Sequence, residues 1–355
     1  GEMVSIQRDR AEMSGSGYSV AIIGATGAVG GVMRSILEER DFPVASLKLL
    51  ASSRSAGKEL TFRGKPVKVE ELTEDSFEGV DYVLSSAGGG ISEKFLPAAV
   101  KAGAVCIDNT SAFRMDEDVP LVVPEVNPHA AFTHKGIIAN PNCSTIQMVV
   151  VLKPLHDAAR IKRVIVSTYQ GIAGAGVTAM EEANKQIRAV LDGKEPHDSE
   201  KFVHSIAFNC LPQISHGVGS DPFDEDGYSD EEAKMTAETV KIMEDPSVRV
   251  TATTVRVPVL VGHSESLNVE TERELTPDEA RDVLAKAPGV TVVDNPAKSE
   301  YPLAIHAAGK DDTFVGRIRK DLSTDNALNM WVVADNLRKG AALNAVQIAE
   351  LLIDA

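Results

Sequence analysis

The segment 18–40 constrains the fold of this chain more than any other. Six residues of strand character, 18–23, lead into Gly24-Ala25-Thr26-Gly27-Ala28-Val29-Gly30, and a helical pattern follows to about residue 40. In such a strand–turn–helix unit the first glycine permits a tight turn, the second lets the backbone approach a pyrophosphate, and the third allows close packing of helix on strand. The N-terminus of the helix offers N–H groups to the phosphates. The spacing therefore predicts a dinucleotide-binding fold.

Strand and helix patterns alternate through the rest of the first half of the chain. Strands are predicted at 46–51, 81–86, 104–108 and 136–139, and helices at 91–102 and 144–156. This alternation is typical of repeated βαβ units, so it predicts a Rossmann-like, doubly wound parallel sheet.

The second half of the chain has a different pattern. Helices are predicted at 177–191 and 230–243, and strands at 163–170, 248–257, 260–271, 313–319 and 328–333. The long alternating strands suit a mostly antiparallel sheet. The 355 residues are also too many for one typical core. We therefore expect an α+β domain after the parallel one.

Two domains are expected after a disordered tail or expression remnant at 1–17. The first spans 18–147 and the second 148–335. The amphipathic segment 336–355 should form a helix that packs back on the first domain, because its apolar positions need a partner surface.

The loop after the second predicted strand indicates which dinucleotide is bound. An NAD-binding fold usually has Asp or Glu about 20 residues beyond the glycines, where the carboxylate holds the ribose 2′-OH. This chain has Ser52, Ser53, Arg54 and Ser55 there. Arginine and serine suit a 2′-phosphate, so the sequence favours NADP over NAD.

Charge and cysteine content exclude several classes of protein. The net charge of −16 argues against nucleic acid or an anionic membrane as partner. No secretory signal and no apolar run of 18 residues occurs in the sequence. Three cysteines without CxxC spacing fit a reducing cytoplasm and predict neither a disulfide framework nor a metal site. Of these, Cys106 lies in a buried-strand pattern, and Cys210 has no base nearby in sequence.

Cys143 is the candidate nucleophile. It follows a short strand and stands at or next to the first turn of the helix predicted at 144–156. Unpaired N–H groups and the helix dipole favour an anion at such a position and lower the pKa of a thiol. The same N–H groups could hold an oxyanion. The alternative is a small buried hydrophobic residue, although the polar neighbours Asn142 and Ser144 do not suit an inert core site.

His263 and Arg256 are candidates for proton transfer and carboxylate binding. The alternative for His263 is a structural histidine in a strand, and for Arg256 an internal salt bridge. Their odd spacing of seven residues would put them on opposite faces of one continuous strand. Convergence therefore requires a strand break between them, and Pro258 and Gly262 are suitable residues.

Several motifs together resemble bacterial-type aspartate-semialdehyde dehydrogenase from about residue 19 to the C-terminus. They are the glycine segment at 24–30, Asn109-Thr110-Ser111-Ala112-Phe113-Arg114, Pro141-Asn142-Cys143-Ser144-Thr145, Thr168-Tyr169-Gln170, Arg256-Val257-Pro258-Val259 and Gly262-His263-Ser264-Glu265. The resemblance implies a homodimer that converts aspartate 4-semialdehyde, phosphate and NADP⁺ reversibly to 4-aspartyl phosphate and NADPH. Its cellular role would be the synthesis of lysine (through diaminopimelate), threonine, methionine and isoleucine.

The resemblance also implies roles for individual residues. Cys143 would be the nucleophile, His263 the acid/base, and Gln170 would hold the substrate or orient the thioester. The substrate would be bound by Arg256 at its α-carboxylate and Glu231 at its α-amino group, with Arg114 and Lys234 on the phosphate and Asn142 beside the nucleophile. The positions that match cofactor contacts are Thr26, Gly27, Ala28, Val29, Arg54, Ser55, Ala173, Gly174 and Asn336.

One position departs from the family pattern, and other functions stay open. Ala173 stands where a serine is expected, which removes a side-chain contact near the nicotinamide. N-acetyl-glutamyl-phosphate reductase shares the expected fold and thioester chemistry, but it should have Gly-Cys-Tyr at the nucleophile. A glyceraldehyde-3-phosphate dehydrogenase is further off, because the acidic residue for NAD is missing. A non-catalytic NADP sensor, with Cys143 in the core, is the alternative from another class.

Overall fold

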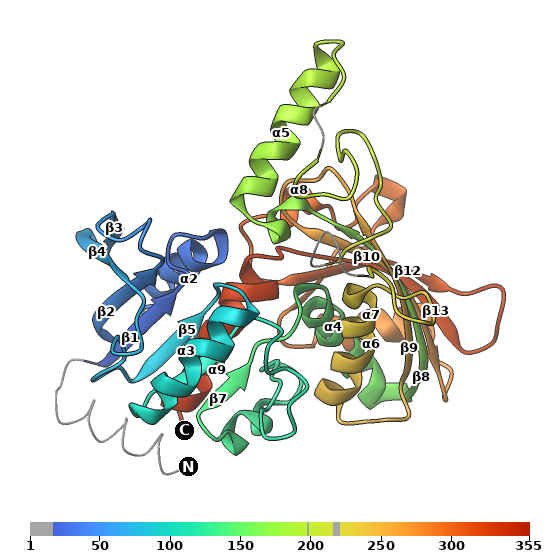
Figure 1. Cartoon of the computed structure of the whole chain (residues 1–355). Coiled ribbons are helices and arrows are strands. Elements are labelled where there is room, and N and C mark those ends of the chain that lie inside the picture. The colour runs from blue at the N-terminus through green and yellow to red at the C-terminus, as the bar shows by residue number, and fades with distance from the viewer. Residues whose placement is uncertain (1–16, 197–198, 216–220) are drawn as a thin grey trace. The chain divides into compact units, whose positions relative to one another are not determined.

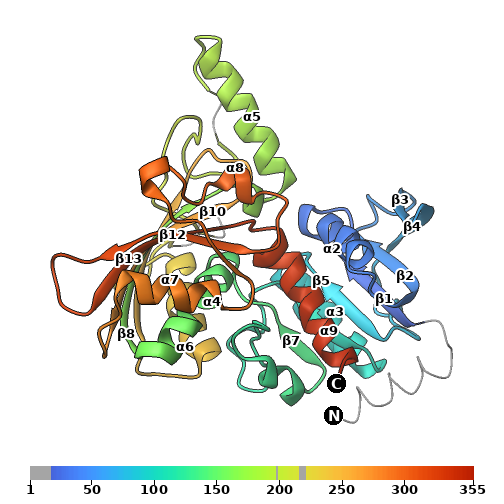
Figure 2. The ribbon, with the colours of Figure 1, turned by 180° about the vertical axis from the view of Figure 1, so that it is seen from behind.

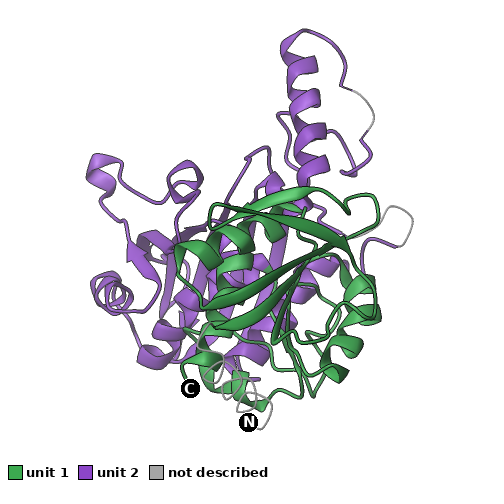
Figure 3. Ribbon diagram, turned by 90° about the vertical axis from the view of Figure 1, so that its left-hand side faces the viewer, with its two compact units in different colours: residues 1–142, 341–355 green, residues 143–340 purple. Residues whose placement is uncertain are grey.

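The computed structural model describes residues 17–196, 199–215 and 221–355. Most of the predicted N-terminal tail, and parts of the irregular region before residue 230, lie outside these ranges. The chain divides into two compact units, residues 1–142 with 341–355 and residues 143–340 (Figure 3). The boundary expected after residue 147 falls inside a helix of unit 2. None of the described helices combines the length and apolar content needed to cross a bilayer.

Unit 1 is built on a seven-stranded sheet of order β3-β4-β2-β1-β5-β6-β7 (Figure 1). All neighbouring strands are parallel except the β3–β4 hairpin. The predicted doubly wound parallel sheet is thus confirmed. The strands are β1 Tyr18–Ile23, β2 Val44–Ala51, β3 Glu59–Phe62, β4 Lys65–Glu71, β5 Tyr82–Ser85, β6 Val105–Asp108 and β7 Ile137–Ala139; the helices are α2 Ala28–Glu39, α3 Gly89–Lys101, the 3₁₀-helix η1 Pro128–Thr133 and α9 Leu343–Ile353.

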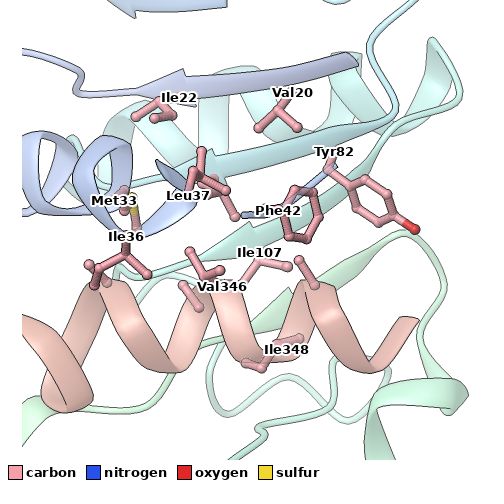
Figure 4. Packing of buried hydrophobic residues seen from close by; sticks show 14 of the residues in the cluster. Val20, Ile22, Met33, Ile36, Leu37, Phe42, Tyr82, Ile107, Val346 and Ile348 are labelled. Carbon is pink, nitrogen blue, oxygen red and sulfur yellow. The ribbon is translucent and has the colours of Figure 1, made fainter. Parts of the chain in front are cut away.

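Helices cover both faces of this sheet. Val20 and Ile22 of β1 point to the face covered by α2 and α9 (Figures 2 and 4). Ala21 and Ile23, which alternate with them, point to the face covered by α3. Because both faces are buried, the strand is continuously apolar from Val20 to Ile23, as is usual for a parallel sheet between helices. The C-terminal helix α9 therefore contributes to the core of unit 1, with Val346 facing Ile36 of α2 and Ile348 buried in the same cluster.

The glycine segment forms the expected turn between β1 and α2. Gly24 has φ +80°, and a Cβ atom there would lie 2.3 Å from the Ser86 carbonyl oxygen. A Cβ atom on Gly30 would lie 2.1 Å from the Gly24 carbonyl oxygen. Both contacts are impossible for a side chain, so close backbone packing explains the first and third glycines.

Unit 2 contains a six-stranded sheet of order β11-β12-β13-β10-β8-β9. Three central pairs are antiparallel, whereas β8–β9 and β11–β12 are parallel. We expected the strands at 248–257 and 260–271 in an antiparallel sheet; β8 lies between them, and β9 runs parallel to it. The strands are β8 Ile161–Gln170, β9 Arg249–Arg256, β10 His263–Thr271, β11 Val290–Val292, β12 Thr313–Lys320 and β13 Ala327–Ala334.

The helices of unit 2 pack mainly on one face of its sheet. Figure 1 shows α4, α6 and α7 alongside the strands, and α4 contacts β8, β10, β12 and β13. The helical elements are α4 Cys143–Ala159, η2 Ile172–Ala175, α5 Val177–Leu191, α6 Asp230–Met243, α7 Pro277–Ala285, η3 Pro296–Lys298, α8 Ala304–Ala307 and a π-helical turn, η4 Arg338–Ala342, whose last two residues belong to unit 1.

Candidate active site

Three polar residues are paired in register at the ends of adjacent strands of unit 2. Gln170 is the last residue of β8, and it pairs with Arg256 of β9 on one side and with His263 of β10 on the other. Strand β9 ends at Arg256 and β10 begins at His263, so the predicted strand break between them is confirmed. A Cβ atom at Gly171 would lie 2.6 Å from the Gly262 carbonyl oxygen, so the turn after β8 requires glycine.

Cys143 is the first residue of α4, as predicted from the sequence. Its Sγ atom lies 3.1 Å from Nε2 of His263. A Cβ atom at Gly340 would lie 3.1 Å from the Cys143 Cβ, so a glycine backbone passes close to this cysteine. At a helix N-terminus the backbone N–H groups and the dipole favour the thiolate over the thiol.

The other two cysteines differ from Cys143 in their surroundings. Cys106 is fully buried in β6, and burial raises the pKa of its thiol far above the ordinary value. Cys210 is exposed. The prediction that Cys106 belongs to the core is confirmed.

His263 is fully buried and is held as a neutral ring. Burial, and secondarily the charge of Arg256, lower the pKa of His263 to about 3, against a hydrogen bond with the Gly262 backbone that raises it. The Gly171 N–H lies 3.1 Å from Nδ1 and 3.0 Å from the Gly262 carbonyl oxygen. Nε2 faces the sulfur, so the neutral ring can accept the thiol proton there.

Arg256 is a buried cation beside this pair. Its Nη1 donates to the Gly171 carbonyl oxygen at 2.7 Å. Burial lowers the pKa of Arg256, while the negative charges of Glu231 and Cys143 raise it. The guanidinium therefore stabilises negative charge at the sulfur and at Glu231.

Gln170 connects the strand ends to helix α6. Its Nε2 donates to Thr168 Oγ1 at 3.1 Å and to Glu231 Oε1 at 3.4 Å. Glu231 is buried in the first turn of α6, which begins with a capping box formed by Ser229 and Glu232. Lys234 pairs with Asp230 at 3.3 Å, on the same helix.

Glu265 is a buried acid that sequence reasoning noted only as part of a motif. It is two residues beyond His263 on β10 and faces the same side, with no exposed surface. Neither carboxyl oxygen has a hydrogen-bond partner in the described part of the chain. Burial, and secondarily the charge of Glu231, raise the pKa of Glu265 well above 4.5. Both influences favour the protonated carboxyl. The sequence signal for this buried acid was a glutamate at an inward-facing position of a strand in which buried and more exposed residues alternate.

A small cradle lies beside the Cys143–His263 pair. A Cβ atom at Gly174 would lie 3.4 Å from Asn336 Nδ2, 3.5 Å from Arg256 Nη1 and 3.6 Å from His263 Cε1. The Gly262 N–H donates to Asn336 Oδ1 at 2.8 Å, whereas Asn336 Nδ2 is buried without a hydrogen-bond partner among the described residues. An amide donor facing a space kept open by glycine fits the carboxamide of a nicotinamide ring.

The neighbouring Ala173 is buried, and its N–H donates to the Leu260 carbonyl oxygen at 2.9 Å.

The cofactor positions of unit 1 gather at the carboxyl ends of β1 and β2. Thr26 Oγ1 lies 3.5 Å from Ser55 Oγ. Helix α2 begins at Ala28 after Gly27, and no side chain caps it. Arg54 is exposed. A bare helix N-terminus beside a hydroxyl pair and an arginine fits phosphate groups of a dinucleotide.

Arg114, which the resemblance assigns to the phosphate, is buried. Its Nε donates to the Asn140 carbonyl oxygen at 2.9 Å and its Nη2 to the Asn109 carbonyl oxygen at 3.0 Å. Side-chain hydrogen bonds from Asn140 to Asn109 and from Asn344 to Asn140 hold these loops together, at 2.7 and 2.6 Å.

The predicted residues thus fall into three groups. Unit 2 brings together Cys143, Gln170, Gly174, Glu231, Arg256, His263 and Asn336. Unit 1 holds the glycine turn that is the candidate phosphate site, and it also holds Arg114 and Asn142. Among residues 17–196, 199–215 and 221–355, no group of three or more His, Cys, Asp or Glu side chains is arranged to hold a metal ion.

Family profiles match most of the sequence. Residues 19–134 match "Semialdehyde dehydrogenase, NAD binding domain", and residues 152–339 match "Semialdehyde dehydrogenase, dimerisation domain".

Curated relatives match nearly the whole chain. The sequence is 59% identical over 340 residues to aspartate-semialdehyde dehydrogenase of Aquifex aeolicus, covering 95% of this chain and 98% of the relative. It is 51% identical to the Bacillus subtilis enzyme, with the same coverage.

Solved structures of aspartate-semialdehyde dehydrogenases also match nearly the whole chain. Aspartate semialdehyde dehydrogenase II of Vibrio cholerae, complexed with ASA, has a TM-score of 0.91 and 48% identity, covering 95% of this chain and 98% of that one. The Candida albicans enzyme with NADP has a TM-score of 0.72 and 26% identity, with the same coverage.

Proposed function

Because the chain belongs to the aspartate-semialdehyde dehydrogenase family, we propose that it converts aspartate 4-semialdehyde, phosphate and NADP⁺ to 4-aspartyl phosphate and NADPH through a thioester on Cys143. The observation that carries this proposal is the 3.1 Å separation of Cys143 Sγ and His263 Nε2 beside Arg256 and Gln170. A thiolate suits this chemistry because it attacks a carbonyl and is also a good leaving group.

The first step forms a bond between Cys143 Sγ and the aldehyde carbon. The helix N-terminus and Arg256 favour the thiolate. His263 Nε2 accepts the proton that the thiol gives up and passes it to the aldehyde oxygen as it becomes a hydroxyl. The product is a hemithioacetal.

The second step oxidises the hemithioacetal to a thioester. A nicotinamide cofactor, when bound, accepts the hydride from the hemithioacetal carbon. His263 Nε2 takes the hydroxyl proton as the C=O bond forms, and that proton then leaves to solvent. Asn336 and Gly174 are the residues of unit 2 that suit the carboxamide of that cofactor.

The third step transfers the acyl group to phosphate. A phosphate oxygen attacks the thioester carbon, the C–S bond breaks, and the Cys143 thiolate is restored. Arg256 is suited to the substrate carboxylate, since a guanidinium binds carboxylates with two parallel hydrogen bonds. Glu231 is suited to the α-ammonium, and Arg114 and Lys234 to the phosphate.

The cofactor is proposed to be NADP because Arg54 and Ser55 stand where NAD-binding folds carry an acid. We also propose that the chain forms a homodimer, since residues 152–339 match a dimerisation domain. In the cell the reverse, reductive direction would supply the synthesis of lysine, threonine, methionine and isoleucine.

NADPH formation from aspartate semialdehyde and phosphate tests the proposal directly. We expect turnover that requires phosphate and produces an acyl phosphate trapped by hydroxylamine. Turnover with NADP⁺ but without phosphate dependence would contradict it, as would activity only with N-acetyl-glutamate semialdehyde.

A further inference from the structure

Gln147 lies one helical turn beyond Cys143, on the same face of α4. It is fully buried. Its Nε2 donates to the His263 carbonyl oxygen at 3.0 Å and, over a longer distance of 3.4 Å, to the Val332 carbonyl oxygen. One side chain therefore connects the helix that carries the sulfur to the residue that carries the imidazole.

Many of the other contacts of α4 are apolar. All residues from Ser144 to Leu152 are buried, and most of them, such as Ile146 and Val150, are apolar. Apolar packing is non-directional, so it tolerates small shifts of a helix along a sheet. The hydrogen bond from Gln147 is directional, and it ends on the backbone of His263 itself.

A shift of α4 would change the distance between Cys143 and His263. The two reacting atoms are 3.1 Å apart, a short distance for a hydrogen bond to sulfur. Displacements of about 1 Å can cost about 10²-fold in rate. Glutamine at this position also lowers the stability of the fold, because its Oε1 is buried with no hydrogen-bond partner in the described residues.

We propose that Gln147 is a positioning residue, which sets the register of helix α4 on strand β10 and so holds Cys143 against His263. The inference rests on the proposed function of that pair. The amide of Gln147 donates to the backbones of His263 and Val332, so its effect passes through the His263 backbone.

The test replaces Gln147 by methionine, which fills a similar volume without an amide, and by leucine, which is smaller. The pH dependence of Cys143 alkylation by iodoacetamide reports the thiol pKa, and steady-state kinetics report kcat and KM. In both variants we expect a higher apparent pKa for Cys143 and a fall in kcat of about 10- to 100-fold. The KM values for aspartate semialdehyde and phosphate should change less than twofold.

Gln186→Met is the matched control. Gln186 is an equally buried glutamine of unit 2 whose amide bonds Ser199 and the Ile206 N–H. Its replacement should lower stability and leave the alkylation profile unchanged. A wild-type profile and kcat in either folded Gln147 variant would overturn the inference. Loss of the proposed function is recognised separately, because Cys143→Ala would then remain active.

Discussion

Cys143 Sγ and His263 Nε2 lie 3.1 Å apart, and the opposite ring nitrogen of His263 faces the Gly171 N–H. The thiol and the imidazole come from a helix N-terminus and a strand start that are 120 residues apart in sequence. Because the buried ring is neutral, it can accept the thiol proton at Nε2, and the positive charge that favours the thiolate comes from Arg256 and the helix.

Replacing Cys143 by alanine should abolish turnover, because no other group can form the thioester. Cofactor binding should persist, since the glycine turn of unit 1 is untouched. NADPH absorbance measures the first and fluorescence titration with NADPH the second. Turnover above about a thousandth of the wild-type value would exclude the covalent mechanism.

Replacing His263 by asparagine should lower kcat by about 10²- to 10⁴-fold, the usual contribution of a positioned proton donor and acceptor. The pH profile gives a sharper test. Because the pKa of the folded His263 is about 3, the wild-type pH profile of kcat should have no inflection from this residue near the ordinary histidine pKa of 6.5. The profiles of the wild type and the variant should therefore have the same shape around that pH. An inflection near 6.5 that disappears in His263→Asn would contradict a neutral ring.

The same ionisation predicts a stability effect. Between pH 6.5 and about 3 the unfolded histidine binds a proton that the folded one does not, so this residue destabilises the fold as pH falls. Urea unfolding of His263→Asn should therefore show a shallower loss of stability between pH 6.5 and 4.5 than the wild type. Parallel curves for the two proteins would argue against the lowered pKa.

Glu265 should affect the pH dependence of folding stability in the opposite direction, and Glu265→Gln tests this. The folded carboxyl keeps its proton above the ordinary pKa of 4.5, where the unfolded carboxyl loses it, so stability falls as pH rises from about 4.5. Glutamine removes this penalty. The melting temperature of the variant should exceed that of the wild type at pH 8 by more than at pH 4.5. An equal difference at both pH values would mean that Glu265 is ionised in the folded state.

Arg54→Ala should weaken NADP binding far more than NAD binding, since only NADP has a 2′-phosphate for the guanidinium. Isothermal titration with each dinucleotide measures this. Arg160→Ala, a surface arginine of unit 2 that pairs with Glu272, is the control and should leave both affinities unchanged. Equal losses for both dinucleotides in Arg54→Ala would refute the 2′-phosphate role.

Much of the molecule follows from local sequence. The glycines at 24, 27 and 30 specify a tight turn between a strand and a helix. The continuous apolar run of β1 requires helices on both faces of its sheet. The start of α4 at Cys143 and the strand break between Arg256 and His263 were likewise visible, because helix ends and strand breaks depend on neighbouring residues.

Strand order and burial were decided only by tertiary structure. The sequence did not reveal that β8 inserts between β9 and β10 and puts Gln170 between Arg256 and His263. Nor did it reveal that Arg114 is buried, that Glu265 keeps its proton, or that Gln147 reaches the His263 backbone. Periodicity and turn chemistry act between residues close in sequence, whereas strand neighbours, desolvation and shared hydrogen bonds join segments a hundred or more residues apart.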